Sequence, residues 1–207
     1  MNRRTMIIGA VMVLGMLTVL ALYIPGIRPE PMQVRAVEGE AAIGGPFNLI
    51  DQNGAAVSDL DFRGKYMLVF FGFTHCPDVC PLTLRMIADA YAIGGPMLEN
   101  VVPIFISVDP ERDTPEIMGE YVMNFDPRIV ALTGSADAIK QAANGYRVFY
   151  RRAAKAEGDT GDDYMMEHSG YVYFMGPDGR YITHFSPKTT AQELAARVRQ
   201  ETSYTNR

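Results

Sequence analysis

One stretch of the chain, in which an apolar run leads through two cysteines into a helical pattern, constrains the fold more than any other. Met67 to Phe73 is rich in Phe and Val and predicts a buried strand. The apolar residues between Leu82 and Tyr91 recur at helical spacing and predict a helix. Strands alternate with helices further along the chain as well. The sequence therefore predicts the α/β class, in which helices cover a central sheet.

The only two cysteines, Cys76 and Cys80, lie in the predicted turn between this strand and this helix. Such a turn presents backbone N–H groups and the positive end of the helix dipole, which favour thiolate over thiol. Residues four apart share one face of a helix and are roughly 6 Å apart along its axis, so the two sulfurs could hold one soft ion or close a disulfide. The alternative is a structural disulfide or two inert core thiols, although Pro77 and Pro81 would fit poorly into a helix interior.

Three separated motifs make the chain similar to a known family. They are FGFTHCPDVCP at 71–81, SVDPERDTPE at 107–116 and HSGYVYFMGPDG at 168–179. In this order, over roughly residues 42–200, the sequence closely resembles the Sco/SenC family of membrane-anchored copper proteins. The resemblance implies a thioredoxin-like fold, copper bound by two cysteines and a histidine, and a role in assembling the binuclear copper site of cytochrome c oxidase.

By motif position, the resemblance implies that the copper ligands are Cys76, Cys80 and His168. Two thiolates and one imidazole form a soft donor set that suits Cu(I), and the nitrogen ligand lets Cu(II) bind as well. Zinc usually takes a fourth ligand in a structural site, and the chain has no third cysteine. In thioredoxin-like folds the loop that corresponds to His168 normally carries a cis-proline, but no proline occurs between Pro127 and Pro177. From the residues alone, His168 could equally be a solvent-facing loop residue.

The amino-terminal segment predicts a membrane anchor. Residues 6–24 are nineteen uncharged, mostly apolar residues. As a helix they would extend about 28 Å, close to the thickness of the hydrocarbon core of a bilayer. They predict a single transmembrane helix. A cleaved signal peptide is the alternative, but it would have a shorter apolar region and a small-x-small cleavage site, for which Ala21-Leu-Tyr23 is a poor match.

The charges on either side of this predicted anchor indicate its orientation. Arg3 and Arg4 precede it, whereas residues 25–40 carry two arginines against three glutamates. The positive-inside rule then places residues 1–5 in the cytoplasm and the rest of the chain outside it. The sequence predicts a single-pass protein of the inner membrane with its carboxy-terminal domain in the periplasm.

The folded domain is expected over residues 42–207, after a stiff, proline-rich linker at 25–41. The chain of 207 residues is 48% hydrophobic and 21% charged, which suits one sizeable core and gives no sign of a second domain. A formal net charge of −5 offers no basic footprint for nucleic acid, so no such partner is expected. In the oxidising periplasm the two cysteines could also form a disulfide.

The remaining patterns predict a thioredoxin-like α/β fold with an added amino-terminal β-hairpin. The hairpin is expected at 47–50 and 55–57, because Asn53-Gly54 accepts the positive φ that a tight turn needs. Polar residues 153–163 predict a loop. Further strands are expected at 101–108, 129–132, 146–151, 171–174 and 181–185, and helices at 115–124, at 135–145 and from Thr190, which forms a capping box with Glu193.

Four polar residues beside the motifs have less specific signals. His75 and Asp78 flank the cysteines, and we expect them to support the site or the helix start rather than to bind the metal. Asp109 and Asp113 are expected to belong to loop and helix-start structure. The alternative is that one of these two carboxylates shapes the copper site or a partner surface.

Three further residues have side chains whose role the sequence leaves to be interpreted. Met165 and Met166 could offer thioether sulfur to an incoming Cu(I), but with thirteen methionines in the chain we expect them to pack against the core. His184 lies on a late predicted strand and is expected to face solvent.

Two functions of different classes follow from these features. The first is a non-enzymatic metallochaperone that takes copper from a donor protein and passes it to cytochrome c oxidase subunit II, or to another copper enzyme, in the same membrane. The second is a thiol-disulfide oxidoreductase that uses Cys76 and Cys80 as a redox pair to reduce the copper-binding cysteines of its target. Copper delivery requires His168, whereas disulfide exchange does not. A peroxide-reducing or redox-sensing role is a third, less favoured interpretation.

Overall fold

The computed structural model describes Met12, Met16 and residues 43–154 and 164–205 of the chain. Contacts divide the chain into units 1–40 and 41–207, and the second holds every element described below. Apart from Met12 and Met16, the predicted cytoplasmic end, anchor and linker lie outside the described residues. So does most of the polar loop predicted at 153–163. Within the described ranges, no helix has both the length and the apolar character that crossing a bilayer requires.

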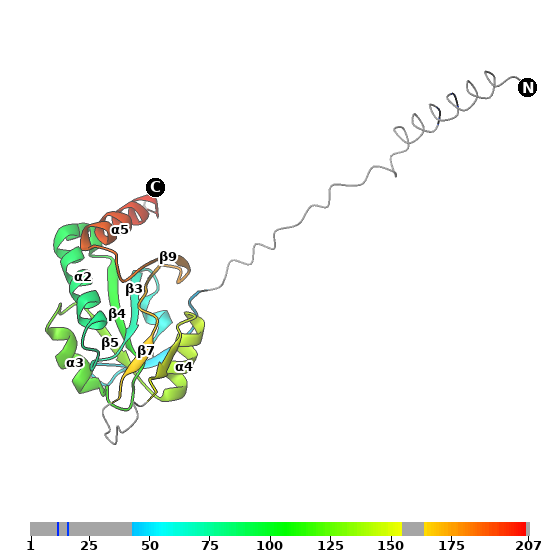
Figure 1. The fold of residues 1–207 in the computed structure, drawn as a ribbon. Coiled ribbons are helices and arrows are strands. Elements are labelled where there is room, and N and C mark those ends of the chain that lie inside the picture. Colours follow the sequence, from blue (N-terminus) through cyan, green and yellow to red (C-terminus); the bar gives the residue numbers. More distant parts are fainter. Residues whose placement is uncertain (1–11, 13–15, 17–42, 155–163, 206–207) are drawn as a thin grey trace, which may run out of the picture. The chain divides into compact units, whose positions relative to one another are not determined.

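A seven-stranded mixed sheet forms the centre of the unit and confirms the predicted α/β class (Figure 1). Its strands follow the order β2-β1-β5-β4-β3-β8-β9. The central strands β3, β4 and β5 are parallel, and every other pairing in this sheet is antiparallel. The bounds are β1 Asn48–Asp51, β2 Ala56–Ser58, β3 Tyr66–Gly72, β4 Val101–Ser107, β5 Val130–Thr133, β8 Val172–Met175 and β9 Tyr181–Phe185.

The predicted amino-terminal hairpin is confirmed at one edge of this sheet. Strands β1 and β2 pair antiparallel with Leu49 opposite Val57. Gly54 in the turn has a φ of 80°, in the left-handed region that glycine adopts readily. Because β1 also pairs with β5, the hairpin extends the parallel core by two strands.

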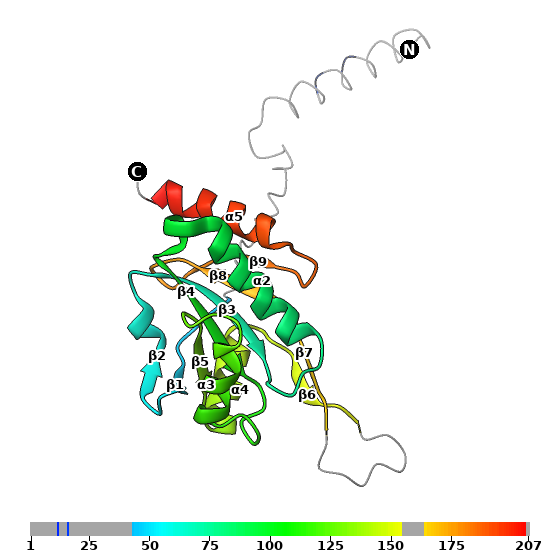
Figure 2. The ribbon, with the colours of Figure 1, turned by 90° about the vertical axis from the view of Figure 1, so that its left-hand side faces the viewer.

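Four α-helices cover the two faces of the sheet. Helices α2, α3 and α5 lie on one face and α4 on the other (Figures 1 and 2). The predicted caps are present: Thr114 and Ser135 accept hydrogen bonds from backbone N–H groups in the first turns of α3 and α4, and Thr190 and Glu193 form the capping box of α5. The bounds are α2 Val79–Gly94, α3 Pro115–Met123, α4 Ala136–Gly145 and α5 Ala191–Thr205, with short 3-10 turns at Asp59–Phe62 and Gly95–Leu98.

The strand predicted at 146–151 begins later than expected. Tyr146 closes α4, and Arg147 has a φ of 55°, so the chain cannot enter an extended strand there. Strand β6 covers Tyr150–Arg152 and pairs with β7, Met166–His168, which the sequence did not predict. The two form a separate two-stranded ribbon that does not pair with the main sheet.

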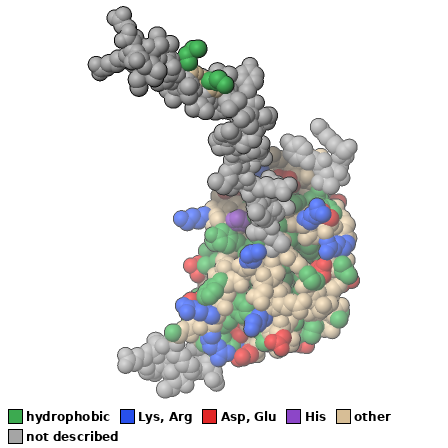
Figure 3. All heavy atoms as spheres, turned by 90° about the vertical axis from the view of Figure 1, so that its right-hand side faces the viewer, with side chains coloured by type: hydrophobic (Ala, Val, Ile, Leu, Met, Phe, Trp, Pro, Cys, Tyr) green, Lys and Arg blue, Asp and Glu red, His purple; other side chains and the backbone are tan. Residues whose placement is uncertain are grey.

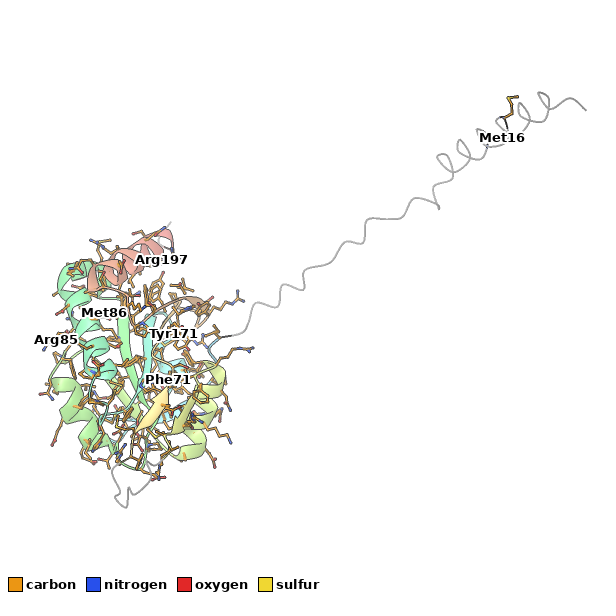
Figure 4. All side chains as sticks on the ribbon, viewed as in Figure 1. Met16, Phe71, Arg85, Met86, Tyr171 and Arg197 are labelled. Carbon is orange, nitrogen blue, oxygen red and sulfur yellow. The ribbon has the colours of Figure 1, made fainter. Side chains whose placement is uncertain are left out.

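Successive side chains of β3 point to opposite faces of the sheet. Phe70 stacks on Phe105 on the face covered by α2, with 5.8 Å between ring centroids. Phe71 meets Tyr146 on the face covered by α4. All seven residues of β3 are buried, as expected for an inner strand with helices on both faces. In Figure 4, Phe71 lies within the domain, whereas Arg85 projects outward from α2.

The outer surface carries charges of both signs. On the face drawn in Figure 3, Lys and Arg side chains are interspersed with Asp and Glu. Such a mixed surface agrees with the slightly acidic net charge of the chain.

Helix α5 packs on α2, the helix that carries Cys80. Substitutions of two leucines test how much this packing stabilises the domain. Leu194 of α5 is fully buried, so Leu194→Ala is expected to lower the free energy of unfolding by about 2–5 kcal/mol in urea titrations. Leu82 on α2 is 64% exposed, and Leu82→Ala is the matched control, with an expected change within about 0.5 kcal/mol. Equal effects of the two substitutions would contradict this packing.

Candidate metal centre

The candidate site lies at the carboxyl end of β3. The chain leaves β3 at Gly72, passes through a turn at residues 73–78, and enters α2 at Val79. Cys76 lies in this cysteine turn and is partly buried, and Cys80 lies in the first turn of α2 and is buried. The carboxyl ends of parallel strands are a common location for functional sites in α/β sheets, because loops and helix amino termini meet there.

His168, the last residue of β7, lies beside the two cysteines although it is 88 residues beyond Cys80 in the sequence. The two Sγ atoms and a ring nitrogen of His168 all lie within 4.8 Å of one another. Among the described residues, these three form the one cluster of at least three Cys, His, Asp or Glu side chains with metal-binding geometry. The tertiary structure therefore brings together the three side chains that the motifs single out.

Gly72 allows Cys80 to approach the sheet closely. A Cβ atom at position 72 would lie 2.6 Å from Cys80 Sγ and 2.8 Å from Cε2 of Phe105. Both distances are shorter than van der Waals contact. The absence of a side chain at Gly72 thus lets the sulfur of Cys80 lie against the end of β3.

The ring of His168 is oriented by aromatic packing and by one hydrogen bond. It meets the rings of Phe70 and Phe73 edge-on, at centroid distances of 6.1 and 5.8 Å. Its Nδ1 lies 3.2 Å from the carbonyl oxygen of Ser169. Because a carbonyl can only accept, Nδ1 carries the proton and Nε2 presents its lone pair, 3.6 Å from Cys80 Sγ. This is the tautomer that a metal-binding imidazole requires.

The two sulfurs share one proton unequally. The hydrogen bond from the Cys80 thiol lowers the pKa of Cys76 far below its usual value, against the opposing effect of burial, and the backbone N–H groups of Asp78 and Cys80 lower it further. The adjacent Cys76 thiolate and burial raise the pKa of Cys80. The metal-free site therefore holds a thiolate at Cys76 and a thiol at Cys80.

Asp113 holds the cysteine turn in place from the β4–α3 loop, which covers residues 108–114. Its carboxylate is fully buried and accepts hydrogen bonds from Thr74 N, from Thr74 Oγ1 at 2.6 Å and from Ser107 Oγ at 2.6 Å. Burial raises the pKa of Asp113, while these donors favour its charged form. The alternative in which Asp113 shapes the cysteine site thus has a structural basis.

Asp109 is also buried, but it faces the β6–β7 ribbon. It forms an ion pair with Arg112 at 2.6 Å and accepts a hydrogen bond from the hydroxyl of Tyr164 at 2.5 Å. His75 and Asp78, by contrast, are exposed, and Nδ1 of His75 bonds to Thr74 Oγ1. None of these side chains belongs to the three-residue cluster.

The sequence also singled out Met165, Met166 and His184. Met166 packs against the hydrophobic core, as expected, whereas Met165 is 43% exposed. His184 is exposed, as predicted, and its ring contacts Tyr171 and Tyr181.

Sequence reasoning did not single out the residues that orient the site. Gly72 allows the close approach of Cys80, Thr74 and Ser107 donate hydrogen bonds to Asp113, and the Ser169 carbonyl orients His168. For Gly72 a signal was available, because an isolated glycine in a strand pattern often marks a site where another group approaches the backbone. For the others, only the folded chain reveals the partner.

The donor set fits a soft metal ion. Three ligands at about 2.0–2.3 Å from one ion would lie roughly 3.5–4 Å apart. The observed limit of 4.8 Å requires only a small contraction of the cluster. Two sulfurs and one imidazole nitrogen match the preference of copper, and the structure has free thiols at both cysteines.

Comparison with known protein families gives a match over most of the chain. The family described as SCO1/SenC matches residues 35–203. Among curated proteins, a SCO2-like protein of Rickettsia prowazekii is 39% identical over 174 residues, which cover 84% of each of the two chains.

Solved structures give the same relationship. ScoI of Bradyrhizobium japonicum, solved with copper bound, is 45% identical with a TM-score of 0.69, and the match covers 77% of this chain and 99% of that one. BsSco is 25% identical with a TM-score of 0.59, covering 78% of this chain and 94% of that one. It is described as having a disulfide switch and as a member of the Sco family of cytochrome c oxidase assembly proteins.

The close approach at Gly72 predicts a large effect of a single methyl group. Gly72→Ala would place a Cβ against Cys80 and Phe105, so we expect the free energy of unfolding to fall by about 1–3 kcal/mol. Gly45→Ala is the matched control, because the nearest atom to its Cβ would lie 3.8 Å away. Urea unfolding of both variants measures the difference. If Gly72→Ala is as stable as Gly45→Ala, the close approach is not present.

The unequal thiols predict unequal reactivity. In the reduced, metal-free protein, the rate at which Cys76 reacts with iodoacetamide should stay nearly constant as the pH is lowered from 8, whereas the rate of an ordinary thiol, with a pKa of about 8.5, would fall. Cys80 should react slowly. In Cys80→Ala the pKa of Cys76 rises, so its rate should fall on acidification. Mass spectrometry of the labelled peptides measures both rates. Equal labelling of the two cysteines would disprove the assignment.

Proposed function

Because the chain belongs to the SCO1/SenC family, we propose that it is a membrane-anchored copper-binding metallochaperone that helps to assemble the binuclear copper centre of cytochrome c oxidase. Copper is its cargo, as Cu(I) or Cu(II). The observation that carries the proposal is the convergence of Cys76, Cys80 and His168 within 4.8 Å. The relative ScoI, solved with copper bound, supports it.

Each of the three side chains has a distinct part in binding copper. Cys76 is partly exposed and already a thiolate, so it meets the incoming ion first. Cys80 gives up its proton when it binds, because a metal ion lowers the pKa of a coordinating thiol. His168 supplies the lone pair of Nε2, which its Nδ1 hydrogen bond keeps directed away from Ser169. A ligand set of two thiolates and one imidazole leaves copper accessible to a competing ligand of a recipient.

The proposed location follows from the amino terminus. A span at residues 6–24, with Arg3 and Arg4 on its cytoplasmic side, would anchor the protein in the inner membrane and place residues 42–207 in the periplasm. The recipient is then the periplasmic copper domain of oxidase subunit II, or of another copper enzyme, and a donor protein supplies the ion. Anchoring both partners in one membrane raises their effective concentration.

A thiol-disulfide oxidoreductase is the second candidate, and the thiolate–thiol pair favours it. The Cys76 thiolate would attack a disulfide of the target, forming a mixed disulfide and releasing one target thiolate. Cys80, after losing its proton to solvent, would then attack Cys76 Sγ and release the second target thiolate. The protein's dithiol is oxidised by two electrons and the target disulfide is reduced. The disulfide switch described for BsSco supports this chemistry.

Copper binding by matched histidine variants tests the site. The reduced chain is expected to bind one copper, and Cu(II) should give a sulfur-to-copper absorption band. His168→Ala should lose nitrogen coupling in the EPR spectrum and bind Cu(II) more than about tenfold more weakly. Mutation of a residue that only orients a metal ligand already lowers metal affinity by about that factor. His184→Ala, at an exposed histidine on β9, is the control and should bind as the wild type does. Unchanged copper binding in His168→Ala would contradict the proposed ligand set.

Assembly in cells separates the two functions. In a strain that depends on this chain, His168→Ala should reduce the copper content of oxidase subunit II as much as Cys76→Ser does if the protein delivers copper. Full copper content with His168→Ala, together with its loss in Cys76→Ser, would instead identify the reductase.

A further inference from the structure

We propose that Tyr164 is a positioning residue for His168, because it fastens the β6–β7 ribbon to the same loop that holds the cysteine turn. The β4–α3 loop would then set the separation between the cysteine half and the histidine half of the site. This inference rests on the proposed copper-binding function. Tyr164 is not one of the proposed copper ligands, so its role would be to position one of them.

His168 needs such a support because its strand is not part of the main sheet. β6 and β7 leave the body of the domain as a ribbon of two three-residue strands (Figure 2). A two-stranded ribbon is marginally stable in water by itself. The register places Tyr150 opposite His168 and Arg152 opposite Met166. The position of His168 therefore depends on contacts between the ribbon and the rest of the domain.

Tyr164 lies two residues before β7 and makes the contacts that fasten the ribbon. Its hydroxyl donates a hydrogen bond to Oδ1 of Asp109 at 2.5 Å. Its ring lies between two guanidinium groups, 3.7 Å from Arg112 on the β4–α3 loop and 3.6 Å from Arg152 on β6. Arg152 is also paired with Glu111 of the same loop at 2.6 Å. Stacking of this kind, with a hydrogen bond to a buried carboxylate, holds β6 and the segment that leads into β7 against the loop.

The same loop holds the other half of the site. Asp109 and Asp113 are joined by a backbone hydrogen bond from the N–H of Asp113 to the carbonyl of Asp109 at 3.0 Å. Asp109 faces Tyr164, and Asp113 faces Thr74 in the cysteine turn. Both carboxylates are almost completely buried, at 2% and 0% exposure. One short segment thus contacts the histidine ribbon on one side and the cysteine turn on the other.

The buried carboxylates make this connection stiff. A buried charge is stable only while its hydrogen-bond partners are in place. Asp109 is held by Arg112 as well as by Tyr164, so removing the tyrosine hydroxyl leaves one buried oxygen without that donor but keeps the ion pair. The expected result is a local shift of the ribbon rather than loss of the fold.

Tyr164→Phe tests the proposal because it removes only the hydroxyl and keeps the ring between Arg112 and Arg152. In the full chain, Cu(II) affinity is expected to fall by about tenfold, and the nitrogen coupling in the EPR spectrum should weaken. Cu(I) affinity should change less, because both thiolates remain. In the metal-free protein, the NMR resonances of the His168 imidazole should shift, while those of Cys76 and Cys80 stay near their wild-type positions.

Tyr181→Phe is the matched control. Tyr181 also uses its hydroxyl in a short hydrogen bond, to His184 at 2.5 Å, but it lies at the end of β9 that pairs with Met175, away from the site. This variant should leave copper affinity and the His168 resonances unchanged. Urea unfolding of both variants shows whether they retain the fold to the same degree.

The outcomes separate this proposal from the proposed function. Wild-type copper affinity, EPR spectrum and His168 resonances in Tyr164→Phe would overturn the positioning role. Equal effects of Tyr164→Phe and Tyr181→Phe on these signals would also overturn it. If the wild-type chain bound no copper, the proposed function would fail, and the metal-free His168 resonances in Tyr164→Phe would still decide whether Tyr164 positions this ring.

Discussion

The close approach of Cys80 to the end of β3 is the contact on which the rest of the structure depends. It requires Gly72, since any Cβ at that position would overlap Cys80 Sγ and the ring of Phe105. The sulfur can reach this position because β3 is an inner strand whose end is open to the amino terminus of α2. Close packing leaves little room for adjustment here, so the backbone fixes one sulfur, and the Cys76 sulfur and the His168 ring lie beside it.

Electrostatics prepare the site for a cation before any ion binds. The thiolate at Cys76 and the thiol at Cys80 give the two metal-free sulfurs a single negative charge. That charge is stabilised by the Cys80 thiol and by the backbone N–H groups of Asp78 and Cys80 at the start of α2. The same arrangement provides a nucleophile for disulfide exchange. The proposed copper binding and the proposed disulfide exchange therefore depend on the same feature of the structure, and they differ mainly in whether His168 would take part.

Much of the fold could be predicted because its signals are local. The apolar run at 67–73, the Asn53-Gly54 turn and the capping box at Thr190 each occupy a few adjacent residues, and the structure has the expected element at each. The strand predicted at 146–151 was placed too early because nothing in the pattern indicates the left-handed conformation of Arg147. Strand β7 was missed because three residues paired only with β6 give too short a pattern.

The sequence by itself determined where the two sulfur atoms lie and how they are arranged locally, because Cys76 and Cys80 are four residues apart at a strand-to-helix turn. Motif resemblance pointed to His168, but only the tertiary structure decided that its ring meets the sulfurs across 88 residues. The same holds for Asp113 with Thr74 and for Asp109 with Tyr164. The physical reason is that secondary structure follows from the periodicity of neighbouring residues, whereas these partners meet only when distant segments pack at one edge of the sheet.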